Sequence, residues 1–213
     1  MMKLITSGFL IKPEPAGFAG AVEQLYTTVF GAARFQKTSH QFRIGVAPVR
    51  PLSWVAMEGD RLAGVIRYWP IEVGPSRHPA LLLGPLAIVA DRKGRGIGSA
   101  LVHKTLALAR QSLTRQSARQ FLGRQSPDAA ASPDLVFLVG DVAYYERFGF
   151  IPATPHGFVM PGERRPDRLQ VFALKNGVLG HVAGDLLRHC ETRVPAAASV
   201  ARMPAILAPA RLA

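Results

Sequence analysis

A glycine-rich stretch, Asp91–Leu101 with the sequence DRKGRGIGSAL, is the part of the chain whose residue types most directly suggest chemistry. Gly94, Gly96 and Gly98 occupy alternate positions between an apolar segment and a predicted helix. Glycine leaves the backbone N–H groups unobstructed, and a helix N-terminus carries a partial positive charge that favours phosphate. The stretch therefore predicts a phosphate or pyrophosphate site, with a tight strand-to-helix connection as the alternative interpretation.

Two common phosphate-binding loops fit this stretch poorly. A Walker A loop needs Lys and then Ser or Thr after its last glycine, whereas Gly98 is followed by Ser99 and Ala100. A dinucleotide-binding fingerprint starting at Gly94 needs an acidic residue about 20 residues later, and residues 115–124 contain none. The first loop is excluded, and the second is weakly supported.

Hydrophobic periodicity indicates that strands and helices alternate along the chain, which is typical of a mixed α/β sheet. We predict strands at Phe9–Ile11, Ser53–Glu58, Leu62–Trp69, Leu81–Val89, Leu135–Val139, Gly149–Ile151 and, as the last one, Leu169–Leu174. We predict helices at Phe18–Phe30, Gly98–Ala109 and Val142–Phe148. The stripe Ile97, Leu101, Thr105 and Leu108 is the expected buried face of the second helix.

The strand before the glycine-rich stretch is expected to lie in the middle of the sheet. Leu81–Val89 is apolar at nearly every position, as in strands that are covered on both faces. Pro85 cannot donate a hydrogen bond to a neighbouring strand, so we expect a bulge or a break in pairing there. The two preceding strands should form a hairpin across the Gly59-Asp60 turn.

The length of 213 residues suits one domain with a sizeable core. We assign residues 1–190 to this domain, with a polar, flexible insertion at 111–133. From about Glu191 the chain becomes rich in Ala and Pro and loses periodicity, so 191–213 is expected to be a weakly ordered tail.

The net charge of +12, from 26 Lys and Arg against 14 Asp and Glu, would attract polyanions such as nucleic acid. The alternative is that these charges belong to solvated faces and extensions. Cys190 is the only cysteine, which excludes an intramolecular disulfide and suits a cytoplasmic protein. The longest apolar run, Ala80–Ala90, is shorter than the roughly 20 residues of a membrane-spanning helix. The six histidines are scattered without ligand spacing, so we expect no metal.

The segment Leu86–Gly98 resembles the cofactor motif of the GNAT superfamily of N-acetyltransferases. That motif is Gln/Arg-x-x-Gly-x-Gly/Ala after an apolar strand, and Lys93 occupies its first position here. The resemblance implies a GNAT fold, with a central mixed, splayed sheet flanked by helices, and acetyl-CoA as co-substrate. It also implies that backbone amides hold the coenzyme A pyrophosphate, at Lys93, Gly94, Arg95, Gly96, Ile97, Gly98 and Ser99. The strand residues Leu86, Ala87 and Ile88 would lie along the pantetheine arm.

A second segment carries the same resemblance. Tyr145-Glu146-Arg147-Phe148-Gly149-Phe150 matches the family pattern Tyr-Glu-x-x-Gly-Phe. The aligned Tyr145 would act as general acid, because a phenol of pKa about 10 can protonate a departing thiolate. Asp141 stands where relatives often have an Asn that touches the pantetheine. An aromatic residue that simply packs in the core is the alternative for Tyr145 and the preferred interpretation of Tyr144.

The two segments are also similar to an uncharacterised bacterial GNAT subgroup that shares an LLLGPLAV strand and an LVGDPAYYxRFGF segment. This resemblance covers about residues 9–190 apart from the insertion, and it names no acceptor. Many relatives use a carboxylate on the central strand as general base, and Leu81–Val89 contains none. Glu58, Glu72 and Asp141 are the nearest candidates, and a water chain is an equal alternative.

We therefore predict an N-acetyltransferase that transfers acetyl from acetyl-CoA to a primary amine on an unidentified small molecule or protein, directly in a ternary complex. Two alternatives stay open. One is a non-catalytic acyl-CoA sensor or interaction module. The other is a nucleic-acid-linked acceptor such as aminoacyl-tRNA, supported only by the charge. Family members often form homodimers, and no membrane partner is expected.

Overall fold

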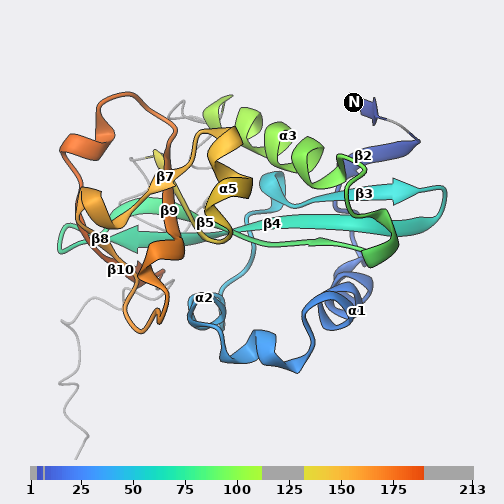
Figure 1. Ribbon diagram of the computed structural model, residues 1–213, viewed down its shortest axis with the longest axis horizontal. Coiled ribbons are helices and arrows are strands. Elements are labelled where there is room, and N and C mark those ends of the chain that lie inside the picture. The colour runs from blue at the N-terminus through green and yellow to red at the C-terminus, as the bar shows by residue number, and fades with distance from the viewer. Residues whose placement is uncertain (1–3, 7, 112–131, 190–213) are drawn as a thin grey trace, which may run out of the picture.

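A ten-stranded mixed sheet organises the protein in the computed structural model, which describes residues 4–6, 8–111 and 132–189 (Figure 1). The strands follow the order β1-β2-β3-β4-β5-β6-β9-β7, and β10 pairs with both β4 and β8. Their bounds are β1 Leu4–Thr6, β2 Phe9–Pro13, β3 Trp54–Glu58, β4 Arg61–Val73, β5 His78–Ile88, β6 Leu135–Val139, β7 Ile151–Pro152, β8 Phe158–Val159, β9 Leu169–Ala173 and β10 Gly184–Arg188.

Helices cover both faces of this sheet (Figure 1). They are α1 Ala19–Phe30, α2 Thr38–Gln41, α3 Ile97–Gln111 and α5 Val142–Tyr145. Successive β3 residues pack in different directions: Ala56 joins the cluster that contains the α3 side chains, whereas Val55 and Met57 join the cluster with α1. Since side chains alternate across a strand, α1 and α3 must lie on opposite faces.

The predicted hairpin is confirmed: β3 and β4 pair antiparallel across a turn in which Gly59 has a φ of 57°. The predicted irregularity at Pro85 is also confirmed. The antiparallel pairing of β4 with β5 shifts between Ile66 and Tyr68, opposite the Gly84-Pro85 pair, whose peptide bond is cis. β5 lies in the middle of the sheet, between β4 and β6, and its ladder with β4 is interrupted at this bulge.

β5 and β6 are neighbours for only a short distance. Their parallel pairing consists of Leu81 with Val136 and Leu82 with Phe137. Beyond these pairs β6 stays bonded to β9 as far as Val139–Leu169, while β5 continues along β4. The two strands thus diverge, and the predicted splayed sheet is present.

Several predicted boundaries differ from the structure. The strand at Leu169–Leu174 is not the last one, because β10 follows and pairs antiparallel with β4. Only Leu186 of β10 is buried, so the segment lacks the apolar alternation that marks a strand. The strand expected from Gly149 is only the two-residue β7.

The helical segments hold other differences. α3 runs two residues beyond the predicted Ala109, and Val102 and Leu106 are buried in it, whereas Leu108 is only half-buried. The predicted helix Val142–Phe148 is α5 followed by a turn of 3-10 helix. The insertion, apart from its ends, and the tail lie outside the described residues.

A buried ion pair joins the start of the chain to β4. Arg67 donates two hydrogen bonds to Glu14, from Nε at 2.8 Å and from Nη2 at 2.6 Å, and both residues are buried. Each carries a charge that would be costly without the other. Glu14 directly follows β2, so the pair fixes the chain at the point where it turns from the sheet towards α1.

We expect Glu14→Gln to destabilise the fold by about 3–5 kcal/mol, because it leaves the guanidinium of Arg67 buried without its bidentate partner. The measurement is the midpoint of urea denaturation. Asp167→Asn is the matched control, since it breaks the exposed Arg165–Asp167 pair and should barely move the midpoint. Equal shifts in the two variants would contradict the assigned role of the buried pair.

Candidate functional site

The glycine-rich turn adopts a shape that exposes its amides. Gly94 and Gly96 have φ values of 78° and 79°, in the left-handed region that favours glycine. α3 begins at Ile97, and the Ala100 N–H donates to the Gly96 carbonyl at 2.9 Å. The N–H groups of Ile97, Gly98 and Ser99 lie in the first turn of α3, where no helix carbonyl is in position to accept a hydrogen bond from them. These three amides are donors that could bind an anion, and the anion site at this turn stays a prediction.

Glu58 contacts two arginines of this turn, Arg92 and Arg95, and Arg92 also contacts Asp91 at 2.8 Å. Arg92 contacts Glu58 at 2.7 Å and Arg95 contacts it at 3.5 Å. The hydrogen bond from Arg92 lowers the pKa of Glu58 below its usual value, which keeps the carboxylate ionised. Glu58 therefore anchors the turn, and this role explains its presence better than that of a general base.

Gly98 makes room for a tyrosine from another element. A Cβ atom at this position would lie 2.5 Å from the hydroxyl oxygen of Tyr144. Tyr144 packs on the core, as expected, and in addition reaches the first turn of α3. Sequence reasoning assigned Gly98 to the coenzyme alone and missed this contact.

A cleft of about 240 Å³ opens where β5 and β6 diverge. The strands contribute Leu82, Leu83, Gly84, Pro85 and Leu86 from β5, and Leu138, Val139, Gly140 and Asp141 from the end of β6. The segment from the end of α1 to the residues after α2 contributes Phe30, Arg34, Lys37, Ser39 and Arg43. Tyr145 and Arg168 complete the lining.

Tyr145 enters this cleft from the last residue of α5. Its ring packs against Gly140, where any side chain would collide with it, and lies 5.8 Å from the ring of Phe150. Burial raises the pKa of Tyr145 well above its usual value, so the phenol stays protonated at neutral pH. Tyr145 therefore has the protonation state that a general acid needs.

The structure brings only part of the predicted site together. Leu86, Asp141 and Tyr145 line one cleft, whereas Ala87 is buried in the cluster that contains α1 and Ile88 packs in the cluster with α3. The carboxylate of Asp141 accepts a hydrogen bond from the Tyr144 N–H at 2.8 Å and caps α5. Residues Lys93–Ser99 are outside the cleft lining, at the start of α3. The assigned roles stay predictions.

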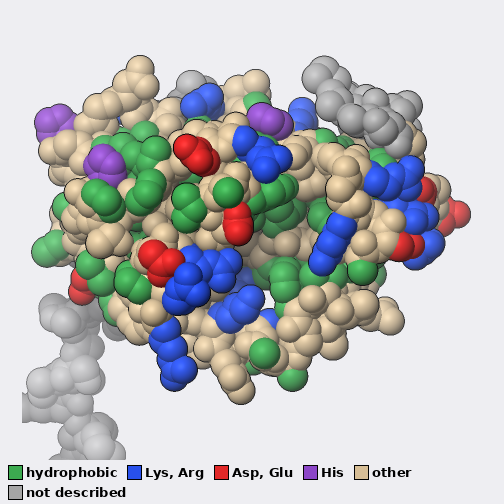
Figure 2. Space-filling model, viewed as in Figure 1, with side chains coloured by type: hydrophobic (Ala, Val, Ile, Leu, Met, Phe, Trp, Pro, Cys, Tyr) green, Lys and Arg blue, Asp and Glu red, His purple; other side chains and the backbone are tan. Residues whose placement is uncertain are grey.

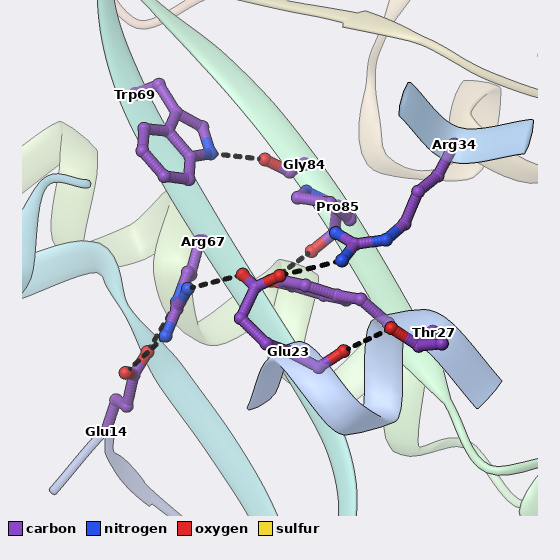
Figure 3. A network of polar contacts seen from close by, with 9 residues as sticks. Glu14, Glu23, Thr27, Arg34, Arg67, Trp69, Gly84 and Pro85 are labelled. Carbon is purple, nitrogen blue, oxygen red and sulfur yellow. Dashed lines mark hydrogen bonds and ion pairs between the residues drawn. The ribbon is translucent and has the colours of Figure 1, made fainter. Parts of the chain in front are cut away.

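Side chains hold the two carbonyls of the β5 bulge in place (Figure 3). The indole N–H of Trp69 donates to the Gly84 carbonyl at 2.7 Å, and the Tyr26 hydroxyl donates to the Pro85 carbonyl at 3.4 Å. Beside these two hydrogen bonds, the carboxylate of Glu23 contacts Nη2 of Arg34 at 2.9 Å and Nη1 of Arg67 at 3.7 Å. Side chains of α1 and β4, and none of β6, thus make the hydrogen bonds that hold the carbonyls of the bulge.

The sequence prediction missed the cations of the cleft, Arg34, Lys37, Arg43 and Arg168. The signal for the first three was the run of basic residues between the first helix and the hairpin, which has no chemical pattern of its own. Arg168 directly precedes β9 and donates to the Gly140 carbonyl at 3.2 Å. Its position follows only from the pairing of β9 with β6.

The described residues contain no cluster of three or more His, Cys, Asp or Glu side chains that could hold a metal ion. In the same part of the chain, no helix combines the length and the apolar character that crossing a bilayer requires.

Residues 19–150 match the Acetyltransferase (GNAT) family, which is more than half of the chain. The protein belongs to the GNAT family. It is similar to the GNAT family N-acetyltransferase YhbS from Escherichia coli in complex with CoA, with 22% identity, a TM-score of 0.66, and coverage of 89% of this chain and 94% of that one. A GNAT family acetyltransferase from Brucella melitensis in complex with acetyl-CoA gives 23% identity, a TM-score of 0.57, and coverage of 86% and 97%. These likenesses establish the fold.

Two curated relatives come from Rattus norvegicus. N-acetyltransferase 8B is 37% identical over 57 residues, which are 27% of this chain and 26% of that protein. N-acetyltransferase family 8 member 2 is 28% identical over 116 residues, which are 52% of this chain and 43% of that protein. The matched segments cover less than half of either relative.

We expect Gly98→Ala to destabilise the protein by about 1–3 kcal/mol, because the new methyl group collides with the hydroxyl of Tyr144. Tyr144→Phe removes that hydroxyl, so the same substitution should cost much less in the Phe background. A double-mutant cycle from chemical denaturation measures the coupling. Gly20→Ala in α1, where a Cβ meets nothing within 4 Å, is the control and should not destabilise. Additive effects of the two changes would refute the contact.

Proposed function

We propose that this protein is an acetyl-CoA-dependent N-acetyltransferase that acetylates a primary amine by direct transfer, with Tyr145 as the general acid. The observation that carries the proposal is the cleft between the diverging strands β5 and β6, with a partly buried Tyr145 in its wall. Family membership supports the reaction class. The lone Cys190 favours a reducing compartment, so we place the reaction in the cytoplasm.

The turn before α3 fits a pyrophosphate. The amides of the first turn of α3 have no partner inside the helix. A Cβ atom added at either positive-φ glycine, Gly94 or Gly96, would have no protein atom within 4 Å apart from its chain neighbours. Lys93 is exposed and makes no ion pair within the described part of the chain. Backbone amides with one free cation suit a diphosphate, because charge-assisted hydrogen bonds to phosphate are strong.

The separation of β5 from β6 fits an extended arm between them. After Leu82 and Phe137 neither strand bonds to the other, so β5 has an edge open on the β6 side. The polar groups of a pantetheine chain can replace the missing strand partner there. Bound acetyl-CoA would supply a thioester whose carbonyl is open to attack by an amine.

The residues of the cleft then account for proton movement. Tyr145 holds its proton and would donate it from Oη to the sulfur as the C–S bond breaks. Neither Glu58 nor Glu72 lines the cleft. Glu58 is paired with Arg92, and Glu72 contacts Arg77 and His189. Asp141 lines the cleft but already caps α5. We infer that water carries the proton away from the attacking amine.

The sensor hypothesis draws support from one observation: among the described residues that line the cleft, Asp141 is the only carboxylate. An acyl-CoA sensor would bind acetyl-CoA and release no thiol with any amine. Thiol release with a panel of amines, measured beside coenzyme binding, therefore separates the two functions.

We expect Tyr145→Phe to lower kcat by about 10²–10⁴-fold while acetyl-CoA binding stays the same, because it removes the acid and keeps the ring. Thiol release and calorimetry measure the two quantities. Tyr68→Phe is the matched control: it removes another buried phenol, bonded to Thr105 at 2.9 Å and outside the cleft lining, and should keep wild-type kcat. A Tyr145→Phe enzyme with wild-type kcat would show that Tyr145 is not the acid.

We expect Gly96→Val to weaken acetyl-CoA binding by about 10-fold or more, because a branched residue cannot keep this φ and the amides turn away from the phosphates. Gly177→Val is the matched control, since Gly177 has a similar φ of 81° and equally open surroundings in the connection after β9. Isothermal calorimetry gives both dissociation constants. The pyrophosphate assignment is wrong if the folded Gly96 variant binds as tightly as the control.

A further inference from the structure

The cleft wall formed by the α1–α2 segment is strongly basic. Arg34, Lys37 and Arg43 line it from this segment and Arg168 from the opposite side, while Asp141 is the only acid among the lining residues that the structure describes. Figure 2 shows Lys and Arg side chains close together in the lower half of the view, in the region where Figure 1 places α2, beside fewer acidic ones. The acetyl-transfer reaction by itself requires no such charge.

Protein groups satisfy these cations only in part. Arg34 contacts Glu23 through Nη2, yet its Nε is buried without a hydrogen-bond partner. Arg43 donates from Nε to the Ser39 carbonyl at 3.0 Å and forms no ion pair with a described carboxylate. Lys37 lies over the ring of Phe30 at 5.3 Å, again without a described carboxylate. The cleft therefore presents guanidinium and ammonium donors that an anion could use.

Burial makes the charge of Arg43 costly. Burial, together with the neighbouring Arg34, lowers the pKa of the Arg43 guanidinium to about 10. The side chain stays charged at neutral pH. Glu23 favours this charge from a distance, but no described carboxylate forms an ion pair with Arg43. An oxyanion in the cleft would supply this missing partner, and a guanidinium matches a carboxylate or phosphate in geometry.

We propose that the acceptor is a small amine that carries an oxyanion, a carboxylate above all, which Arg43, Lys37 and Arg34 bind while the amine points to Tyr145. The proposal rests on the acetyltransferase function given above. Tyr145 and these cations line the same cleft, so one small molecule can reach both.

The phosphates of the coenzyme are a poor explanation for these cations. The unpaired amides suited to a diphosphate lie at the start of α3, and α1 covers the opposite face of the sheet (Figure 1). The coenzyme would therefore enter from the α3 side, and the cations face the side left for the acceptor.

A matched set of amines tests the proposal: an ω-amino carboxylate, its primary amide, the diamine of equal length and the corresponding aminoalkyl phosphonate. With the full chain and saturating acetyl-CoA, we expect kcat/KM for the carboxylate to exceed that for the amide and the diamine by about 10-fold or more. Preference for the phosphonate would keep the oxyanion and identify phosphate as its source. Thiol release with equal or higher kcat/KM for the amide or diamine would overturn the proposal and leave the acetyltransferase function standing. Thiol release only with protein or peptide amines would overturn the small acceptor.

Charge-removing variants assign the preference to residues. Arg43→Gln and Lys37→Gln should each reduce the ratio of kcat/KM for carboxylate over amide by about 10-fold, mostly through KM, and leave the dissociation constant of acetyl-CoA unchanged. Arg43→Lys should restore part of the ratio. Arg50→Gln, at an exposed arginine outside the cleft lining, is the control and should keep the wild-type ratio.

Two results with folded variants would refute the assignment. If both Gln variants keep the wild-type ratio of kcat/KM for carboxylate over amide, the proposed oxyanion site is wrong. Weaker acetyl-CoA binding with an unchanged ratio would assign the cations to the coenzyme. If the wild-type protein neither binds acetyl-CoA nor releases thiol with any amine, the proposed function itself is refuted.

Discussion

The divergence of β5 from β6 is the constraint on which the rest of the site depends. A continuous parallel ladder would fill the space between the strands with backbone hydrogen bonds and leave no cleft. Pairing ends after Leu82 and Phe137 because β5 bulges at Gly84-Pro85, where Pro85 has no N–H to donate. β6 stays on β9, so the two strands are held apart from both sides. The sheet thus opens next to the Gly84-Pro85 bulge of β5.

The two sides of the cleft rest on different supports. α1 and β4 hold the bulge through Tyr26 and Trp69, and the Glu14–Arg67 ion pair ties β4 to the chain before α1. The other wall depends on Asp141, which caps α5 and so sets the direction of Tyr145. The polar contacts that hold each wall come from its own side of the cleft.

Sequence reasoning recovered what local pattern encodes. The glycine spacing predicted the strand-to-helix turn, the Gly59-Asp60 turn predicted the hairpin, and Pro85 predicted the irregularity in β5. The splayed sheet followed from the resemblance to the GNAT family. The sequence prediction missed β10, whose single buried leucine gives no alternation, and it missed the cleft cations. Arg43 and Arg168 are 125 positions apart in the chain, and only strand pairing and the path after α1 bring both to one cleft. Long-range placement of this kind leaves no periodic signature.

Trp69 offers a consequence of a different kind. It is one of only two tryptophans in the chain, and its indole N–H is bonded to the carbonyl of Gly84, a residue of the cleft wall. The emission of an indole depends on the polarity and hydrogen bonding around its nitrogen. The protein therefore carries an intrinsic fluorophore attached to the bulge, so occupancy of the cleft can be followed optically without a label.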